Sequence, residues 1–144
     1  MVKLQTFIIS EQQGFEGDKL VVKNPNYIFR PTSVPGNYSL ALALGFVGEG
    51  IREKNTFSIK MLDPKGGTFN ETPDIELVPP GEKEREVLKL YPDEIANLNI
   101  VMDLPNAEFR LEGKYTTIIS LNGEELDRKD FFIVAKEKSI YGQF

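Results

Sequence analysis

The side chains in this sequence that could do chemistry are carboxylates, lysines and tyrosines, because it contains no histidine and no cysteine. The missing histidine removes the usual general base and the commonest transition-metal ligand. The missing cysteine removes thiolate nucleophiles and disulfides. A hydrolase would need two carboxylates brought together from distant positions, as in glycosidases, and nothing in the sequence marks such a pair. We therefore expect no catalytic residue, no cofactor and no enzyme activity.

Two groups of carboxylates could bind a cation or a basic partner. One lies in "ETPDIE" and its neighbourhood and comprises Glu71, Asp74, Glu76 and Asp63. Hard cations such as calcium favour oxygen ligands from loops, but the EF-hand spacing is absent, and solvated surface acids have the same composition. The other group alternates along one face of a short stretch and comprises Glu82, Glu84 and Glu86. These acids either protect a strand edge or form an acidic patch for a basic partner, and no metal ligand is assigned.

The charge distribution bears on the class of partner. The net charge is −5, and residues 1–72 hold 8 Lys and Arg against 7 Asp and Glu, whereas residues 73–144 hold 9 against 15. Nonspecific binding to nucleic acid or to an anionic membrane requires positive charge. We therefore expect neither partner.

The first ten residues, "MVKLQTFIIS", lack the length and cleavage signature of a signal peptide. No run approaches the roughly 18 apolar residues of a membrane-spanning helix. The length of 144 residues suits one domain, so we expect a single cytoplasmic domain over residues 1–144.

The elements that must position these side chains are strands, because the dominant hydrophobic period is two. In "YSLALALGF" (38–46), large residues at even positions alternate with small residues at odd positions. Further strands are expected at 4–10, 19–23, 56–62, 74–78, 84–91, 98–104 and 115–121. The only helical signal is one short helix near residues 92–97, where Pro92 precedes two acids. Seven to nine short strands predict an all-β fold, an antiparallel immunoglobulin-like β-sandwich, with a barrel as the alternative.

The clearest local signal is the hairpin in "EGKYTTIISLNGEEL" (112–126). Asn122 and Gly123 form the preferred pair for a two-residue type I′ turn, which pairs Leu121 with Glu124. Tyr115 stands near the strand entry, where a tyrosine can bond to the main chain just upstream, or can be an ordinary core residue. Continuing the alternation places Phe132 on the core side, and the charged residues before it require either an overhanging strand or a bulge.

This register leaves Phe131 and Ile133 on the opposite face, which then needs cover. The last residues are unusually apolar for a chain end, with Ile140, Tyr141 and Phe144 in a candidate docking tail at 139–144. We expect either this tail or a second chain to cover the two residues.

The run "NIVMDLPNAEFRLEGKYTTIISLNGEELDRKDFFIVAK" resembles the C-terminal half of an uncharacterised bacterial and phage β-sandwich family. The layout "FIISEQQGFEGDKLVVKNPNYIF", followed by a proline loop and the strand "YSLALAL", is similar to the N-terminal half of that family. The resemblance implies the fold and a prokaryotic or phage source. It implies no activity and no site residues.

Three functions remain in competition at this point. The first is a non-catalytic interaction module of a bacterium, phage or mobile element, which binds a protein partner or itself through a sheet face, an edge strand or the tail. The second is a structural component of a virion or other assembly, which rests on fold analogy alone. The third is a carboxylate-based hydrolase.

Overall fold

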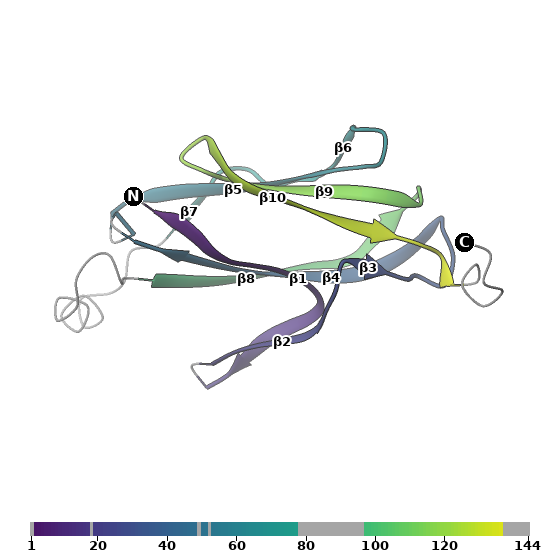
Figure 1. Cartoon of the computed structure of the whole chain (residues 1–144), viewed down its shortest axis with the longest axis horizontal. Helices are drawn as coiled ribbons and strands as arrows, with labels where there is room; N and C mark the ends of the chain where they lie inside the picture. The colour runs from purple at the N-terminus through teal and green to yellow at the C-terminus, as the bar shows by residue number, and fades with distance from the viewer. Residues whose placement is uncertain (1, 18, 49, 52, 78–96, 137–144) are drawn as a thin grey trace.

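The computed structural model places the chain in two β-sheets that face each other, and it describes residues 2–17, 19–48, 50–51, 53–77 and 97–136 (Figure 1). The first sheet has the strand order β2 (Lys19–Pro25), β1 (Lys3–Glu16), β4 (Gly36–Val47) and β8 (Asn97–Phe109). The second has the order β3 (Ile28–Phe29), β10 (Glu124–Ile133), β9 (Gly113–Leu121), β5 (Asn55–Leu62) and β6 (Thr68–Glu71), and β7 (Ile75–Leu77) also pairs with β5. The predicted all-β sandwich is confirmed, with two sheets rather than a closed barrel.

Among the described strands, all pairs are antiparallel except β3 with β10, which is parallel. The described residues contain no helix long and apolar enough to cross a membrane. The predicted helix at 92–97 and the predicted strand at 84–91 fall outside the described residues, apart from Asn97, which begins β8.

The core lies between the sheets, where each central strand buries one of its alternating faces. On β9 this face is Tyr115, Thr117, Ile119 and Leu121. On β4 the large residues point into the core, and the small residues of the opposite face are buried as well. A Cβ at Gly45 would lie 3.0 Å from both Thr6 Cβ and Asn99 Oδ1, so the neighbouring strands β1 and β8 close over this position. Glycine avoids this crowding, since any side chain there would have to displace the side chains of Thr6 and Asn99.

Two of the strands are longer than the sequence pattern indicated. β1 runs to Glu16, well beyond the strand expected at 4–10. β8 runs to Phe109, beyond the strand expected at 98–104. A register shift opposite Tyr38 and Leu40 accommodates Pro105 and Asn106, and it moves the buried face of β8 from even to odd positions.

A second bulge corrects the predicted facing of β10. Leu121 does pair with Glu124, but the register shifts between Glu125 and Asp127, so Ile119 pairs with Asp127 rather than with Leu126. The extra residue reverses the alternation, because one inserted residue turns every later side chain to the other face. Phe131 and Ile133 are consequently in the core with no exposed surface. The prediction that they form an outer face covered by the tail or by a second chain is therefore wrong.

The hairpin turn itself is as the sequence predicted. Asn122 and Gly123 both have positive φ, 51° and 83°. Asn122 also ties the turn to β5, because its side chain donates to Asn55 Oδ1 (3.0 Å) and accepts from the amide of Thr56 (3.0 Å). The two residues therefore fix the register of the hairpin and anchor it to the neighbouring strand.

The tyrosine corner at Tyr115 is present, since its hydroxyl donates to Leu111 O at 2.7 Å. Burial raises the pKa of this hydroxyl, which stays protonated and available as a donor. The ring stacks on Phe131 with 5.4 Å between centroids and packs edge-to-face on Phe69 and Phe109. This aromatic cluster fills one end of the core.

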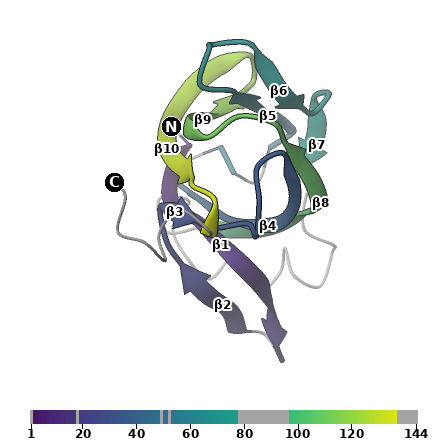
Figure 2. The same cartoon turned by 90° about the vertical axis from the view of Figure 1, so that its right-hand side faces the viewer.

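The β1–β2 pair leaves the sandwich as a projecting arm (Figure 2). β1 pairs with β4 as far as Ser10 and with β2 from Ser10 onward. At the base of the arm, the Tyr38 hydroxyl donates to Glu11 Oε1 (2.5 Å), a bond that lowers the pKa of Glu11. The proline-bearing segment after β2 crosses from the first sheet to the second, where β3 pairs with β10 and Phe29 is buried in the core.

Candidate functional site

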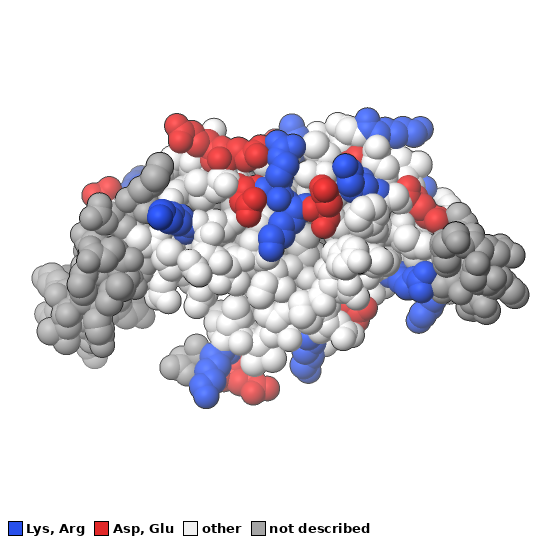
Figure 3. Space-filling view, in the orientation of Figure 1, with Lys and Arg blue, Asp and Glu red and all other residues white. Residues whose placement is uncertain are grey.

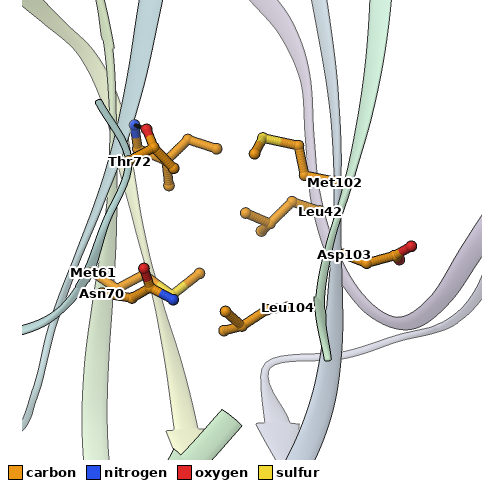
Figure 4. Close-up of a pocket in the computed structure, with 8 residues that line it drawn as sticks. Leu42, Met61, Asn70, Thr72, Met102, Asp103 and Leu104 are labelled. Atoms are coloured by element: carbon orange, nitrogen blue, oxygen red, sulfur yellow. Dashed lines mark hydrogen bonds between the residues drawn. The ribbon is translucent and has the colours of Figure 1, made fainter. Parts of the chain in front are cut away.

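The candidate site is a slot between the two sheets, on the lateral side formed by β8 and β6 (Figure 4). It has a volume of about 180 Å³. Its lining residues are Leu42, Ile59, Met61, Asn70, Thr72, Met102, Asp103 and Leu104. Apolar side chains thus provide most of a hollow that opens to solvent at the margin of the core.

Each wall of the slot follows from strand alternation. On β8, Met102 and Leu104 lie on the face that packs against the core, and both are only half-buried. On the facing sheet, Met61 is buried at the end of β5, and Asn70 lies opposite it on β6. In Figure 4 the side chains of Met102, Leu42 and Leu104 point toward those of Met61, Asn70 and Thr72.

The polar groups of the slot are few. The Thr72 hydroxyl accepts a hydrogen bond from the main-chain amide of Ile59 (2.9 Å), so its bond is made to the protein itself. Asp103 is the one charged residue among those that line the slot, and in Figure 4 its carboxylate points away from the cavity. It accepts a hydrogen bond from Gln13 Nε2 of the arm at 3.1 Å. The slot is therefore suited to an apolar group, with one negative charge on the outer side of its wall.

β8 is the last strand of its sheet among the described residues and pairs with β4 alone. Its other edge carries main-chain N–H and C=O groups that no described strand pairs with. The slot and this edge lie side by side, because three of the residues that line the slot, Met102, Asp103 and Leu104, belong to β8.

The opposite lateral side of the sandwich, formed by β1 and β10, is built differently. Lys129 of β10 reaches across to β1, where its ammonium donates to Phe7 O (2.6 Å) and lies 5.3 Å from the centre of the Phe7 ring. The exposed part of β10 is charged, with Glu125 and Arg128 ion-paired. In Figure 3, positive and negative side chains alternate along the layer of β10, above an uncharged band between the layers. A cation and a charged, bulged strand thus occupy this side.

The residues singled out from the sequence fall into three groups. Tyr115, Asn122 and Gly123 hold the hairpin, as described above. Phe131 and Ile133 belong to the core and line no open surface. The tail residues Ile140, Tyr141 and Phe144, and the acidic stretch with Glu82, Glu84 and Glu86, lie outside the described residues.

The carboxylates considered for a cation are not brought together. Asp63 caps its own turn, accepting from the amides of Lys65 (2.8 Å) and Gly67 (3.0 Å). Glu76 lies 3.5 Å from Lys54. Within the described ranges, no three acidic residues form a group that could hold a metal ion.

The sequence did not mark the slot residues as a site. Met61 and Met102 stand on predicted strands with the correct facing, and nothing in their spacing distinguishes them from other core residues. They border an opening because of the order of the strands in the two sheets, which sequence periodicity does not specify.

The comparison with known families identifies the chain. Residues 17–134 match the model of a family described as "Family of unknown function (DUF6941)". The chain belongs to this family. No curated protein matches its sequence. Membership confirms the predicted resemblance to an uncharacterised family and leaves the activity open.

Two solved structures share the fold. An immunoglobulin-like protein from Pseudomonas aeruginosa superposes with a TM-score of 0.52 at 13% identity, covering 93% of this chain and 97% of that one. The alkylpurine DNA glycosylase AlkC from Pseudomonas fluorescens, solved bound to DNA with an abasic site analog, gives 0.55 at 10% identity and 92% coverage of this chain. The chain spans only 30% of the length of AlkC. At these identities the likeness shows the fold alone, which is an immunoglobulin-like sandwich.

Proposed function

We propose that this chain is a non-catalytic protein-interaction module of a bacterium, phage or mobile element, and that its partner docks at the slot between β8 and β6. The observation that carries the proposal is an apolar slot, open to solvent, beside a strand edge that no described strand occupies. Concave apolar sites with few polar groups are the usual places where side chains of a partner insert.

The placement of the perturbed ionisable groups supports a role without catalysis. Active sites gather such groups in a cleft. Here the hydrogen bond and charge of Arg128 lower the pKa of Glu125, and the hydrogen bond from Tyr38 lowers that of Glu11. Each of these groups is bound to a neighbouring side chain, and neither lines the slot.

A protein partner fits the net charge better than nucleic acid or an anionic membrane does. We propose that this partner is met in the cytoplasm. The net charge of −5 opposes approach to phosphate. The DNA in the AlkC structure is a property of that much longer protein, and we carry it no further here.

The test is site-specific photo-crosslinking in lysate of the source organism. A photoreactive residue at position 70 faces the slot, and one at position 65, in the turn before β6, serves as the control. We expect a protein species that crosslinks from position 70 and not from position 65. Identical species from both positions, or none from position 70, would contradict the proposed function.

A further inference from the structure

The open edge of β8 is the starting point. Its core-facing residues Ile100, Met102 and Leu104 are half-buried, although they pack against the core. A strand placed beside β8 would cover these side chains and would pair main-chain groups that no described strand reaches. Addition of an extended segment to a free sheet edge is a general mode of peptide recognition.

The slot has room for one side chain of such a segment. A protein cavity of about 150 Å³ lined by aliphatic residues can hold benzene, and the slot measures about 180 Å³. Alternate residues of an added strand would point into the space between the sheets, where Met61 and Met102 form the walls. Methionine walls adapt to the shape of a leucine, isoleucine or phenylalanine.

The charge on the outer face of β8 indicates which residue types should alternate with the inserted side chain in the added strand. The side chains that alternate with the inserted one would lie on the outer face of the sheet, beside Asp103. This carboxylate lies on a chain of net charge −5. A lysine or arginine at these positions complements it.

We propose that the partner presents an extended segment in which apolar and basic residues alternate, and that this segment adds to β8 as a fifth strand of its sheet. One apolar side chain enters the slot, and a basic side chain pairs with Asp103. This inference rests on the proposed function and names the chemical class of its partner.

The other lateral side does not offer the same site. Lys129 donates to Phe7 O on the stretch of β1 that pairs, among the described strands, with β4 alone. β10 carries a bulge and alternating charges at its edge. Both devices oppose strand addition.

The probe is a capped nine-residue peptide with leucine at its centre, threonine at the other odd positions and lysine at the even positions. Binding is followed by fluorescence anisotropy, and the site by amide hydrogen exchange. We expect alternate amides of residues 97–104 to gain protection, while those of β10 do not change. Replacing the central leucine by asparagine should weaken binding about ten- to a hundredfold, since the insertion buries one full apolar side chain.

Protein variants locate the site. Asn70→Phe should fill the slot and lower the affinity to that of the asparagine peptide, whereas Thr68→Phe, on an exposed position of the same strand, should leave it unchanged. Asp103→Asn should weaken binding about two- to fivefold, as expected for a solvent-accessible ion pair. Asp103→Lys should reverse the preference toward a peptide with glutamate in place of lysine.

Three outcomes overturn the inference. The first is no binding at about 1 mM peptide, which corresponds to less than about 4 kcal/mol of binding free energy. The second is protection on β1 or β10 instead of β8. The third is slow exchange of the outward amides of β8 before peptide is added, which would mean that residues 78–96 or a second copy already pair there. If crosslinking from position 70 still captures a partner in these cases, the module role stands and only strand addition fails.

Discussion

The two lateral sides of this sandwich differ in how their strand edges are covered. On the β1 and β10 side, Lys129 bonds to Phe7 O, and a bulge interrupts the strand beside a row of charged residues. On the β8 and β6 side, the described residues leave a strand edge without a partner, above a slot walled by two methionines. Unprotected edges pair readily with other chains, so the edge of β8 that no described strand covers is where we propose that a partner docks.

This difference is one of packing, and it underlies our proposal of a docking side in a chain without histidine or cysteine. Phe7 and Met102 both belong to strands of the first sheet that border its lateral openings. Phe7 is buried and borders a hollow that Lys129 also lines, whereas Met102 is half-buried and lines the slot. The expected effects of substitution on the two sides therefore differ, and four experiments measure that difference.

The largest loss of stability should come from a substitution on β10, which belongs to the side formed by β1 and β10. Phe131→Ala should lower the free energy of unfolding by about 3–5 kcal/mol, because the ring is fully buried against Tyr115 and Phe29. Phe132→Ala, on the outer face, should cost less than about 1 kcal/mol. Urea unfolding of both variants tests the register after the bulge. Equal losses, or a larger loss for Phe132, would show that the strand faces the other way.

The two methionines that face each other across the slot should differ. Met61→Ala should cost about 2–5 kcal/mol, since only 3% of this residue is exposed. Met102→Ala should cost about half as much or less, because its side chain already borders solvent. The comparison uses the same chemical change on both walls, measured by denaturant unfolding. A Met102→Ala loss as large as that of Met61→Ala would mean that the slot is closed in solution.

The tyrosine corner gives a smaller effect. Tyr115→Phe should lower stability by about 1–2 kcal/mol, because it leaves Leu111 O without its hydroxyl donor. The melting temperature should fall by about 2–8 °C, and Tyr27→Phe, at a position 62% exposed, is the control with no expected change. An unchanged melting temperature for Tyr115→Phe would show that the hydrogen bond does not contribute to stability.

The smallest loss of stability should come from removing Lys129, on the side formed by β1 and β10. Lys129→Ala should cost about 0.5–1 kcal/mol, since it removes an exposed cation–π contact and one hydrogen bond to the main chain. Lys114→Ala, on the paired strand and exposed, provides the control. Size-exclusion chromatography of the Lys129 variant should also show more self-association, because the β1 edge loses its cover. A variant with the stability and the elution volume of the parent would remove this distinction between the two sides.

Local signals carried most of the fold. Strict alternation in residues 38–46 and 115–121 predicted the two central strands and their buried faces, because a half-buried strand shows its pattern in the sequence directly. Asn122 and Gly123 predicted the turn, since both positions need positive φ. The facing of Phe131 was mistaken, because the charged residues before it allowed either an overhanging strand or a bulge, and only the fit of β10 against β9 decided for the bulge.

The candidate site could not be predicted from the sequence, for a related reason. Sequence alone determined an all-β sandwich, the absence of histidine and cysteine chemistry, and the identity of most core residues. Only the tertiary structure decided which core residues border an opening, because that depends on strand order, on two bulges and on which sheet edges lie next to each other. Met102 and Leu44 carry the same periodic signal. One lines a slot and the other is fully buried, because β8 stands at the margin of its sheet and β4 in the middle.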